Sequence, residues 1–468
     1  MSVGESNRLA VSAPPRTGRV FAIVALAVGM ANLDLFVVNV ALPVIGRDFH
    51  GTPLSSLSWV LNGYAIVFAA LLVPLGRIAD RIGHRTGFLL GLGGFTLASA
   101  LCALCPSVGW LIAARVLQAA GAALCVPTSL ALLLATAPPE RRAPLVRAWV
   151  AVGGVAAALG PVLGGLLTQV DWRWVFLINV PIGVAGLVLG PRVLPRNDAR
   201  ADKPWPDMLG SALMIFSVGA LALALVRADD WGWGSVRFGG TLAAAVLAAA
   251  LFVWRSTAHP APVLDMTLLR VRGFGIATVA ATLFTVAFAM MLLSVVLWCQ
   301  HVLGYSAVQT GLAVAPGPLM VPLLSLTVTH LARRMGGANR VAALGTALFA
   351  AGIGWWAATV DPTVPASYPG QILPGMLLTG IGVGLTLPAL IGSAAAALPA
   401  SQFATGSAVI QMGRQVGSVL GISVLVTVLG GRSGQDPVEA FRAGWLVVLG
   451  VCAVTLVASV WPAGRPAA

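Results

Sequence analysis

The sequence has 468 residues, of which 58% are hydrophobic and only 9% are charged, and its formal net charge is +13. A soluble globular protein has roughly 25% charged residues, so this composition excludes an ordinary water-facing surface. The positive charge comes from arginines scattered between apolar runs, with Lys203 as the single lysine. Because arginine next to apolar runs is typical of multi-span membrane proteins, the charge does not indicate a nucleic-acid partner.

Apolar runs of about 20 residues recur along the chain, and each is long enough to cross ~30 Å of hydrocarbon as a helix. Barrel strands are shorter and alternate in polarity, so these runs predict an all-α polytopic membrane protein. The first run is too long for a signal peptide and is interpreted as an uncleaved span. Fourteen transmembrane helices are predicted, at 19–45, 57–76, 87–106, 110–136, 144–169, 174–194, 207–226, 237–254, 274–300, 311–332, 339–360, 370–396, 404–430 and 441–461.

The distribution of lysine and arginine predicts the orientation of these helices. With fourteen spans, 20 of the 28 Lys and Arg residues fall on the side that holds both termini. Basic loops remain in the cytoplasm, so both termini are expected to be cytoplasmic. The predicted location is the cell membrane, where lipid surrounds the chain.

Three pairs of segments resemble one another at offsets of 253, 261 and 257 residues. GRIADRIGHRTG resembles THLARRMGGANR, RVLQAAGAALCVP resembles MLLTGIGVGLTLP, and GPVLGG resembles GSVLGI. Parallel repeats with a substrate site between them occur in one large transporter architecture. The predicted organisation is a cytoplasmic tail (1–18), a six-helix bundle (19–194), a linker with two extra helices at 207–226 and 237–254 (195–273), a second six-helix bundle (274–461) and a cytoplasmic tail (462–468).

Asp34 is the only carboxylate deep within a predicted span. Ionisable residues inside spans are functional by default, although an aspartate that serves packing or helix register remains the alternative. Arg115 is the other deep charge of the first half, which makes it the expected partner. Burial disfavours the charged form of the Asp34 carboxylate, and Arg115 favours it. The distance between Asp34 and Arg115 would therefore set the proton affinity of Asp34. We therefore predict that Asp34 and Arg115 form a proton-coupling site.

The loop after the second predicted span is interpreted as a conformational latch. An aspartate stands at a helix end among arginines, and a glycine permits a tight turn. The alternative is a charge cluster that only sets topology. The latch residues are Gly76, Arg77, Asp80, Arg81, Gly83 and Arg85.

Further along, Gly160 and Gly164 form a small-xxx-small pattern that lets two helices approach closely, and Pro161 weakens the span. Helix packing without a role in gating is the alternative. Arg414 is deep in the thirteenth span without an obvious acidic partner, so it binds either an anionic or carbonyl-rich substrate or backbone carbonyls. Side chains assigned to substrate contact are Asn32, Asn39, Gln118, Trp298, Gln300, Gln411 and Arg414.

These motifs together resemble the fourteen-span drug:proton antiporter branch of the major facilitator superfamily, over residues 19–461. The resemblance rests on LDLFVVNVALP (33–43), the latch signature, RVLQAAG (115–121), GPVLGG (160–165), DWRWVFLINVPIG (171–183) and LGYSAVQTGLAVAPG (303–317). Here GPVLGG matches the antiporter motif of the fifth span, which assigns Gly160, Pro161, Gly164 and Gly165 to it. The resemblance also implies the Asp34–Arg115 pairing.

The resemblance implies proton-coupled efflux of lipophilic small molecules, such as drugs or antibiotics, by alternating access. The alternative is a carrier of another small metabolite or lipid on the same fold, with or without proton coupling. The spans lack a metal cluster or a nucleophile–base pair, so neither an enzyme nor a metal site is expected. The proton gradient supplies the energy without a cofactor, and a monomer is expected. Dication-exporting members often carry extra carboxylates in the second half, whereas this chain favours neutral, weakly anionic or monocationic aromatic substrates.

Overall fold

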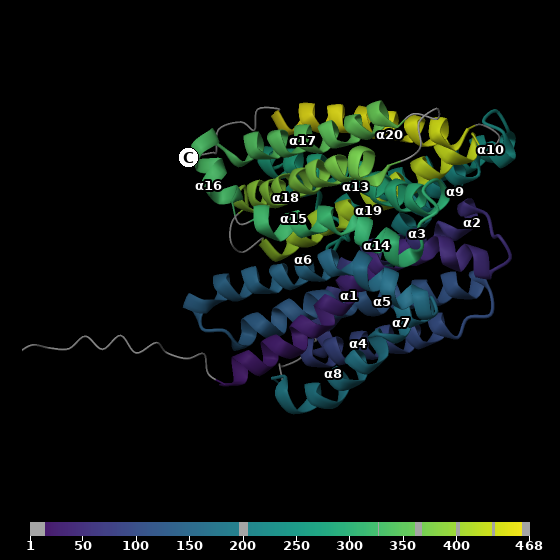
Figure 1. Ribbon diagram of the computed structural model, residues 1–468. Coiled ribbons are helices and arrows are strands. Elements are labelled where there is room, and N and C mark those ends of the chain that lie inside the picture. Colours follow the sequence, from purple (N-terminus) through teal and green to yellow (C-terminus); the bar gives the residue numbers. More distant parts are fainter. Residues whose placement is uncertain are drawn as a thin grey trace, which may run out of the picture.

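The computed structural model describes residues 15–195, 205–325, 327–360, 367–398, 403–432 and 436–460, and in these ranges the chain is helical and contains no strand (Figure 1). The Lys203 side chain and most of both predicted tails lie outside the described residues. The helices of the first half are α1 (Pro15–Asp48), α2 (Leu54–Leu57), α3 (Trp59–Ile82), α4 (His84–Ala103), α5 (Val108–Thr136), α6 (Pro139–Val170), α7 (Trp174–Leu177) and α8 (Asn179–Val193).

The linker and the second half contain the remaining helices. The linker contains α9 (Met208–Val226), α10 (Ala228–Trp231), α11 (Val236–Ala258) and α12 (Met266–Arg270). The second half contains α13 (Arg272–His301), α14 (Ala307–Val314), α15 (Pro316–Ser325), α16 (Val328–Met335), α17 (Ala338–Thr359), the π-helical η1 (Tyr368–Ile372), α18 (Leu373–Ala396), α19 (Phe403–Gly430) and α20 (Pro437–Val460).

Within the described residues, 13 helices are long and apolar enough to cross a membrane. This confirms the prediction of an all-α chain with many spans. The predicted fifth span corresponds to α6, whose described part contains the shorter apolar segment Leu159–Val170. The exact number of fourteen spans therefore stays a prediction.

The tenth predicted span, 311–332, begins earlier in the structure, at Ala307, and Ala307–Ser325 is long and apolar enough to cross a membrane. Between α14 and α15, Ala315 keeps right-handed helical backbone angles, so these two helices are continuous. Pro316 begins α15 and Pro322 lies inside it, where each lacks the N–H group that would bond to the preceding turn. The helix α16 covers the predicted end of the span.

The two halves lie one above the other in Figure 1, with the first half (purple to blue) below and the second half (green to yellow) above. Inside the first half, α1 packs on α6 and α4 packs on α5. Inside the second half, α13 packs on α19 and α17 packs on α18. Contacts between the halves involve α3 with α19, α6 with α14, and α1 with α13. The halves therefore meet along two seams with α1 and α13 between them.

The inserted helices α9 and α11 pack on each other, and α9 also contacts both α3 and α19. Thr427 on α19 donates a hydrogen bond to the Leu225 carbonyl at the end of α9 over 2.7 Å. At the opposite end of α9, the Arg81 guanidinium lies 4.4 Å from the centre of the Trp205 ring. The insertion therefore contacts each half at the seam between α3 and α19.

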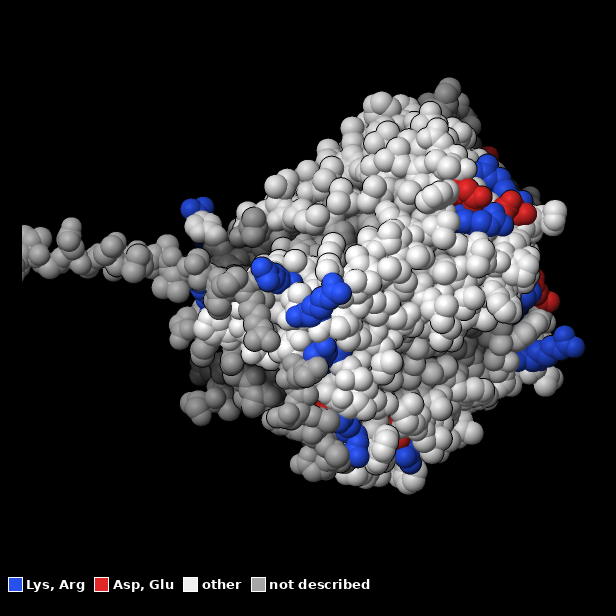
Figure 2. Space-filling model, turned by 90° about the horizontal axis from the view of Figure 1, so that it is seen from below, with Lys and Arg blue, Asp and Glu red and all other residues white. Residues whose placement is uncertain are grey.

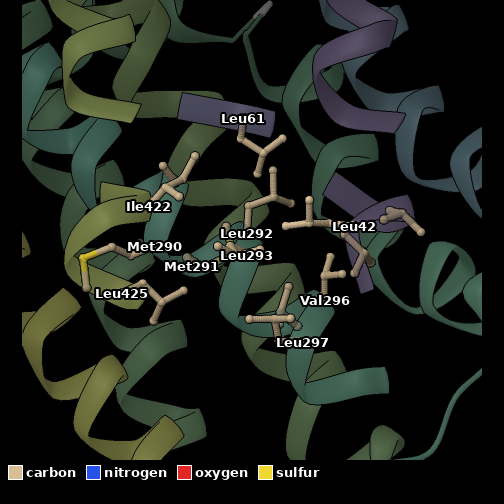
Figure 3. Packing of buried hydrophobic residues seen from close by; sticks show 14 of the residues in the cluster. Leu42, Leu61, Met290, Met291, Leu292, Leu293, Val296, Leu297, Ile422 and Leu425 are labelled. Carbon is tan, nitrogen blue, oxygen red and sulfur yellow. The ribbon is translucent and has the colours of Figure 1, made fainter. Parts of the chain in front are cut away.

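The largest hydrophobic cluster joins the two halves near the end of α1 that finishes at Asp48. Leu42 on α1 and Leu61 on α3 belong to it, together with Leu293 on α13 and Ile422 on α19. Figure 3 shows these side chains pointing toward one another between the helices. Because helices in a membrane associate through van der Waals packing of their side chains, this cluster holds the halves together at that end.

Much of the protein surface carries no charged side chains. On the face in Figure 2, a broad uncharged area separates the basic residues toward the left from basic and acidic residues at the right. Exposed large hydrophobic residues such as Leu97, Phe216 and Val246 are common on the helices. An apolar band between charged ends is the arrangement that a bilayer requires.

Candidate proton and substrate site

Asp34 on α1 and Arg115 on α5 form an ion pair inside the first half, through Asp34 Oδ2 and Arg115 Nη1. Both side chains are fully buried. The Arg115 Nε group donates to the Val60 carbonyl on α3 over 3.2 Å. The Arg115 guanidinium also lies 4.3 Å from the centre of the Tyr64 ring, a cation–π arrangement. A single arginine therefore connects α1, α3 and α5.

The second oxygen of the Asp34 carboxylate, Oδ1, accepts two further hydrogen bonds. Gln118 Nε2 donates to it over 2.9 Å and Asn179 Nδ2 over 3.1 Å. Gln118 Nε2 also contacts Ser99 Oγ over 2.9 Å, while Gln118 Oε1 accepts from Arg115 Nη1 over 2.6 Å. Three donors from α5 and α8 therefore converge on one carboxylate of α1.

Three members of this site, Asn179, Ser99 and Tyr64, are not among the candidate residues that the sequence indicates. Gln118, predicted to contact substrate, lies in this site instead. Each is at most 1% exposed. A signal was available for Asn179, because it is an amide inside the apolar sixth span, where a polar side chain needs a partner. Serine and tyrosine are common enough in spans that no sequence signal singled them out.

The proposed latch lies where α3 ends and α4 begins, at Gly83, whose φ of 91° favours glycine. Asp80 Oδ1 lies 3.5 Å from His84 Nε2. Arg85 donates to the Pro191 carbonyl on α8 over 2.5 Å, and Arg81 stacks on Trp205. The latch residues therefore contact α8 and the start of the insertion.

Two other latch residues precede this turn on α3. Gly76 lies next to Pro127 of α5, with 3.7 Å from its ideal Cβ position to the proline ring. Arg77 is partly buried, and its Nη1 has no hydrogen-bond acceptor among the described residues.

The GPVLGG segment brings three helices together. A Cβ on Gly160 would lie 2.4 Å from Phe36 Cβ, and one on Gly164 would lie 3.0 Å from the Val37 carbonyl oxygen, both on α1. The next glycine, Gly165, faces the other half: its Cβ would lie 2.6 Å from the Ala307 carbonyl oxygen on α14.

The partner helix α14 contributes its own glycine to this contact. A Cβ on Gly311 would lie 2.3 Å from the carbonyl oxygen of Pro161 and 3.4 Å from the Cα of Gly165. The backbones of α6 and α14 are therefore in direct contact, without side chains between them. The small-residue pattern thus serves a contact between the two halves.

The polar residues assigned to substrate contact occupy different environments. Asn32 and Asn39 are half-buried, and each donates to a carbonyl of its own helix, over 2.9 and 2.8 Å. Gln300 on α13 donates to the Val40 carbonyl on α1 over 3.1 Å, which links the halves. Trp298 is fully buried, with ring centres 5.4 Å from Phe441 and 5.3 Å from Trp445, so it belongs to an aromatic cluster.

Arg414 lies on α19 in the second half, where Nη1 donates to Gln411 Oε1 over 3.1 Å. Its Nε has no acceptor among the described residues. The described residues also contain no group of three His, Cys, Asp or Glu side chains that could hold a metal ion. The chemistry that these groups can perform is therefore proton binding at Asp34 and hydrogen bonding to a polar ligand.

Comparison with known proteins shows the family to which the chain belongs. The family model described as Major Facilitator Superfamily matches residues 24–422. A methylenomycin A resistance protein of Streptomyces coelicolor is 34% identical over 88% of this chain and 86% of its own length. A tetracenomycin C resistance and export protein of Streptomyces glaucescens is 34% identical over 88% of this chain and 76% of its own.

Solved structures agree in fold. The crystal structure of an auto-inhibited POT family peptide transporter superimposes with a TM-score of 0.66, covering 95% of this chain and 99% of that chain at 18% identity. A bacterial homologue of the human lysosomal transporter Spinster, in an inward-facing and unoccupied conformation, gives a TM-score of 0.66 at 14% identity, covering 96% of this chain and 98% of that chain.

Proposed function

Because the chain belongs to the major facilitator superfamily and is therefore a transporter and not an enzyme, we propose that it exports lipophilic small molecules in exchange for protons. The observation that carries the proposal is the fully buried Asp34 carboxylate, paired with Arg115 and held by Gln118 and Asn179. The proposed assignment within the family is the fourteen-span drug:proton antiporter branch, acting as a monomer with the proton gradient as its energy source.

The proton step follows from the bonds at Asp34. When the carboxylate is charged, Arg115 and the two amides stabilise it. A proton on Asp34 removes the charge that Arg115 pairs with and weakens all three contacts. Since these donors come from α5 and α8, protonation favours a different arrangement of the helices. A ligand shifts a conformational equilibrium only through its differential affinity for the two states, and the proton is such a ligand here.

The substrate class follows from the relatives. Two relatives are named for resistance to methylenomycin A and for export of tetracenomycin C, and a third is named as a cephamycin export protein. These names support export of antibiotic-like compounds. The alternative of a carrier for another metabolite or lipid on the same fold remains a second outcome of the transport experiment below.

The distribution of arginine supports cytoplasmic termini, since 20 of the 28 Lys and Arg residues then lie inside the cell. In this orientation, the cluster of Leu42, Leu61 and Ile422 lies at the outer side of the membrane. The described conformation would therefore be closed toward the outside. In the alternating-access cycle, this cluster must separate before substrate leaves.

The experiment is proton-coupled transport in vesicles that contain the purified protein. Asp34→Asn keeps the size of the side chain and mimics the protonated acid, with one acceptor oxygen and one donor group, but cannot exchange a proton. It should retain substrate binding and lose uphill transport together with substrate-induced proton movement. The matched control is Asp48→Asn, at the end of the same helix, where the side chain accepts from Trp172 and is exposed. Uphill, proton-coupled transport by Asp34→Asn would show that coupling resides elsewhere.

A further inference from the structure

The second half contains a cluster of polar side chains that the proton site does not use, of which Gln415 is buried and Gln411 and Arg414 are half-buried. Arg414, Gln411 and Gln415 lie within five residues of one another on α19. Gln415 is 7% exposed, and its Nε2 has no acceptor among the described residues. Arg414 Nε likewise has none, and Arg414 is held by a bond to Gln411 Oε1. Buried donors without acceptors cost free energy, so two on one helix call for a ligand.

The packing of α19 indicates the direction of this cluster. Gly413 and Gly417 face α13, where their Cβ atoms would meet Thr282. Met412 and Val409 share a cluster with Met214 of α9, and Ser423 bonds to Asn62 of α3. With 100° between successive residues, Arg414 and Gln411 lie on the remaining arc, opposite α9. Gln415 follows Gln411 by about one turn and shares its side of the helix.

The charges of the helical interior do not balance. In the first half, Asp34 and Arg115 neutralise each other. In the second half, no carboxylate of the described residues lies within 4 Å of Arg414, and its span contains no acidic residue. Leaving one charge unpaired in a low-dielectric site is strongly unfavourable. Arg414 is therefore a positive charge in a membrane span without an anionic partner among the described residues.

We propose that Arg414, Gln411 and Gln415 form a substrate subsite that binds a carboxylate group, so that lipophilic acids are preferred cargo. This rests on the proposed export function and names the substrate class for it. The guanidinium presents N–H groups in a planar fork that matches a carboxylate. Gln411 holds the fork in place through its oxygen, and Gln415 supplies a further amide N–H donor.

The test compares acids with amides of the same skeleton. 2-Naphthoate and anthraquinone-2-carboxylate, each with its primary carboxamide, are titrated at pH 7.5 into the full-length protein in lipid nanodiscs, and affinity is measured by calorimetry. The wild-type protein should bind each acid more tightly than its amide. Arg414→Gln should weaken acid binding by about 10- to 100-fold, as expected for a lost charge-assisted hydrogen bond, and leave amide binding nearly unchanged.

Two further variants complete the design. Arg442→Gln removes the same charge from an exposed position on α20 and should preserve the preference for acids. Gln415→Met removes the orphan amide while keeping a similar volume, and it should lower acid affinity less than Arg414→Gln does. If Arg414→Gln fails to fold, Gln415→Met and Arg414→Lys carry the test, and both should reduce the ratio of acid to amide affinity.

The proposal is overturned if the wild type shows no preference for acids, binds neither compound, or keeps its preference in all Arg414 and Gln415 variants. Transport separates this result from the export function. Export of the neutral carboxamides without acid preference leaves export standing and removes the subsite. Arg414-dependent acid binding without transport of any compound leaves the subsite standing and removes export.

Discussion

Asn179 on α8 donates a hydrogen bond to Oδ1 of Asp34 on α1 over 3.1 Å, and both side chains are buried. The bond connects the last helix of the first half to the carboxylate at its centre. It also places an amide where it stabilises the charged carboxylate and loses that role when Asp34 takes up a proton.

Replacing Asn179 by leucine should slow uphill transport, because the amide that holds Oδ1 of Asp34 is lost. One net hydrogen bond is worth about 1 kcal/mol, which corresponds to roughly a fivefold change in rate. The measurement is the initial rate of substrate-induced proton movement in vesicles. Thr455→Val removes another buried hydrogen bond, to the Val451 carbonyl on α20, and should leave the rate unchanged. An unchanged rate in Asn179→Leu would make Asn179 a packing residue.

Arg115→Met should destabilise the protein by about 3–5 kcal/mol, because it leaves a buried carboxylate without its cation. Adding Asp34→Asn to that variant removes the unpaired charge and should restore part of the loss. Thermal unfolding of the four proteins in the same detergent checks this double-mutant cycle. Strictly additive effects would contradict an energetic coupling between the two side chains.

At the latch, Asp80→Asn should leave the amount of protein in the membrane unchanged and slow transport up to about fivefold. The size follows from the 0–1 kcal/mol that a partly exposed charged contact contributes, here the approach of Asp80 Oδ1 to His84 Nε2 at 3.5 Å. Initial transport rates, normalised to protein in the membrane, measure it. Wild-type rates would reduce this loop to a determinant of topology.

Gly165→Ala should lower both the unfolding temperature and the transport rate, since its Cβ would lie 2.6 Å from the Ala307 carbonyl oxygen of the other half. Overpacking of this kind typically costs about 1–3 kcal/mol. Gly154→Ala is the matched control on the same helix, because nothing lies within 4 Å of its Cβ position. Equal behaviour of the two variants would remove the steric argument for the seam between α6 and α14.

Reporter fusions after residues near 265 and 336 should give cytoplasmic signals, and a fusion near 231 should give an external one. The physical basis is the excess of arginine on one side of the spans. Residue 231 ends the short helix α10 between the inserted helices α9 and α11. A cytoplasmic signal there would contradict the insertion of two spans between the halves.

Much of this architecture could be predicted because the bilayer imposes length and polarity on each span. Asp34 and Arg115 stood out for the same reason, as charges in apolar runs. The bonds that Asn179 donates to Asp34 and Gln118 donates to Ser99 could not be predicted, because they depend on how α4, α5 and α8 pack. The tenth span begins at Ala307 because Ser306 and Gln309 form a capping box there, which hydrophobicity alone does not reveal.

The contact between Gly165 and Gly311 also bears on how fast the halves can change orientation. Where the side chains of two helices interdigitate, they must separate before the helices can change their relative orientation. Here backbone touches backbone, with 3.4 Å from the ideal Cβ position of Gly311 to Gly165 Cα. No long side chains therefore need to separate between α6 and α14 when the two halves change orientation. In the leucine-rich cluster near Asp48, by contrast, side chains from both halves such as Leu42 and Ile422 are packed together and would have to separate.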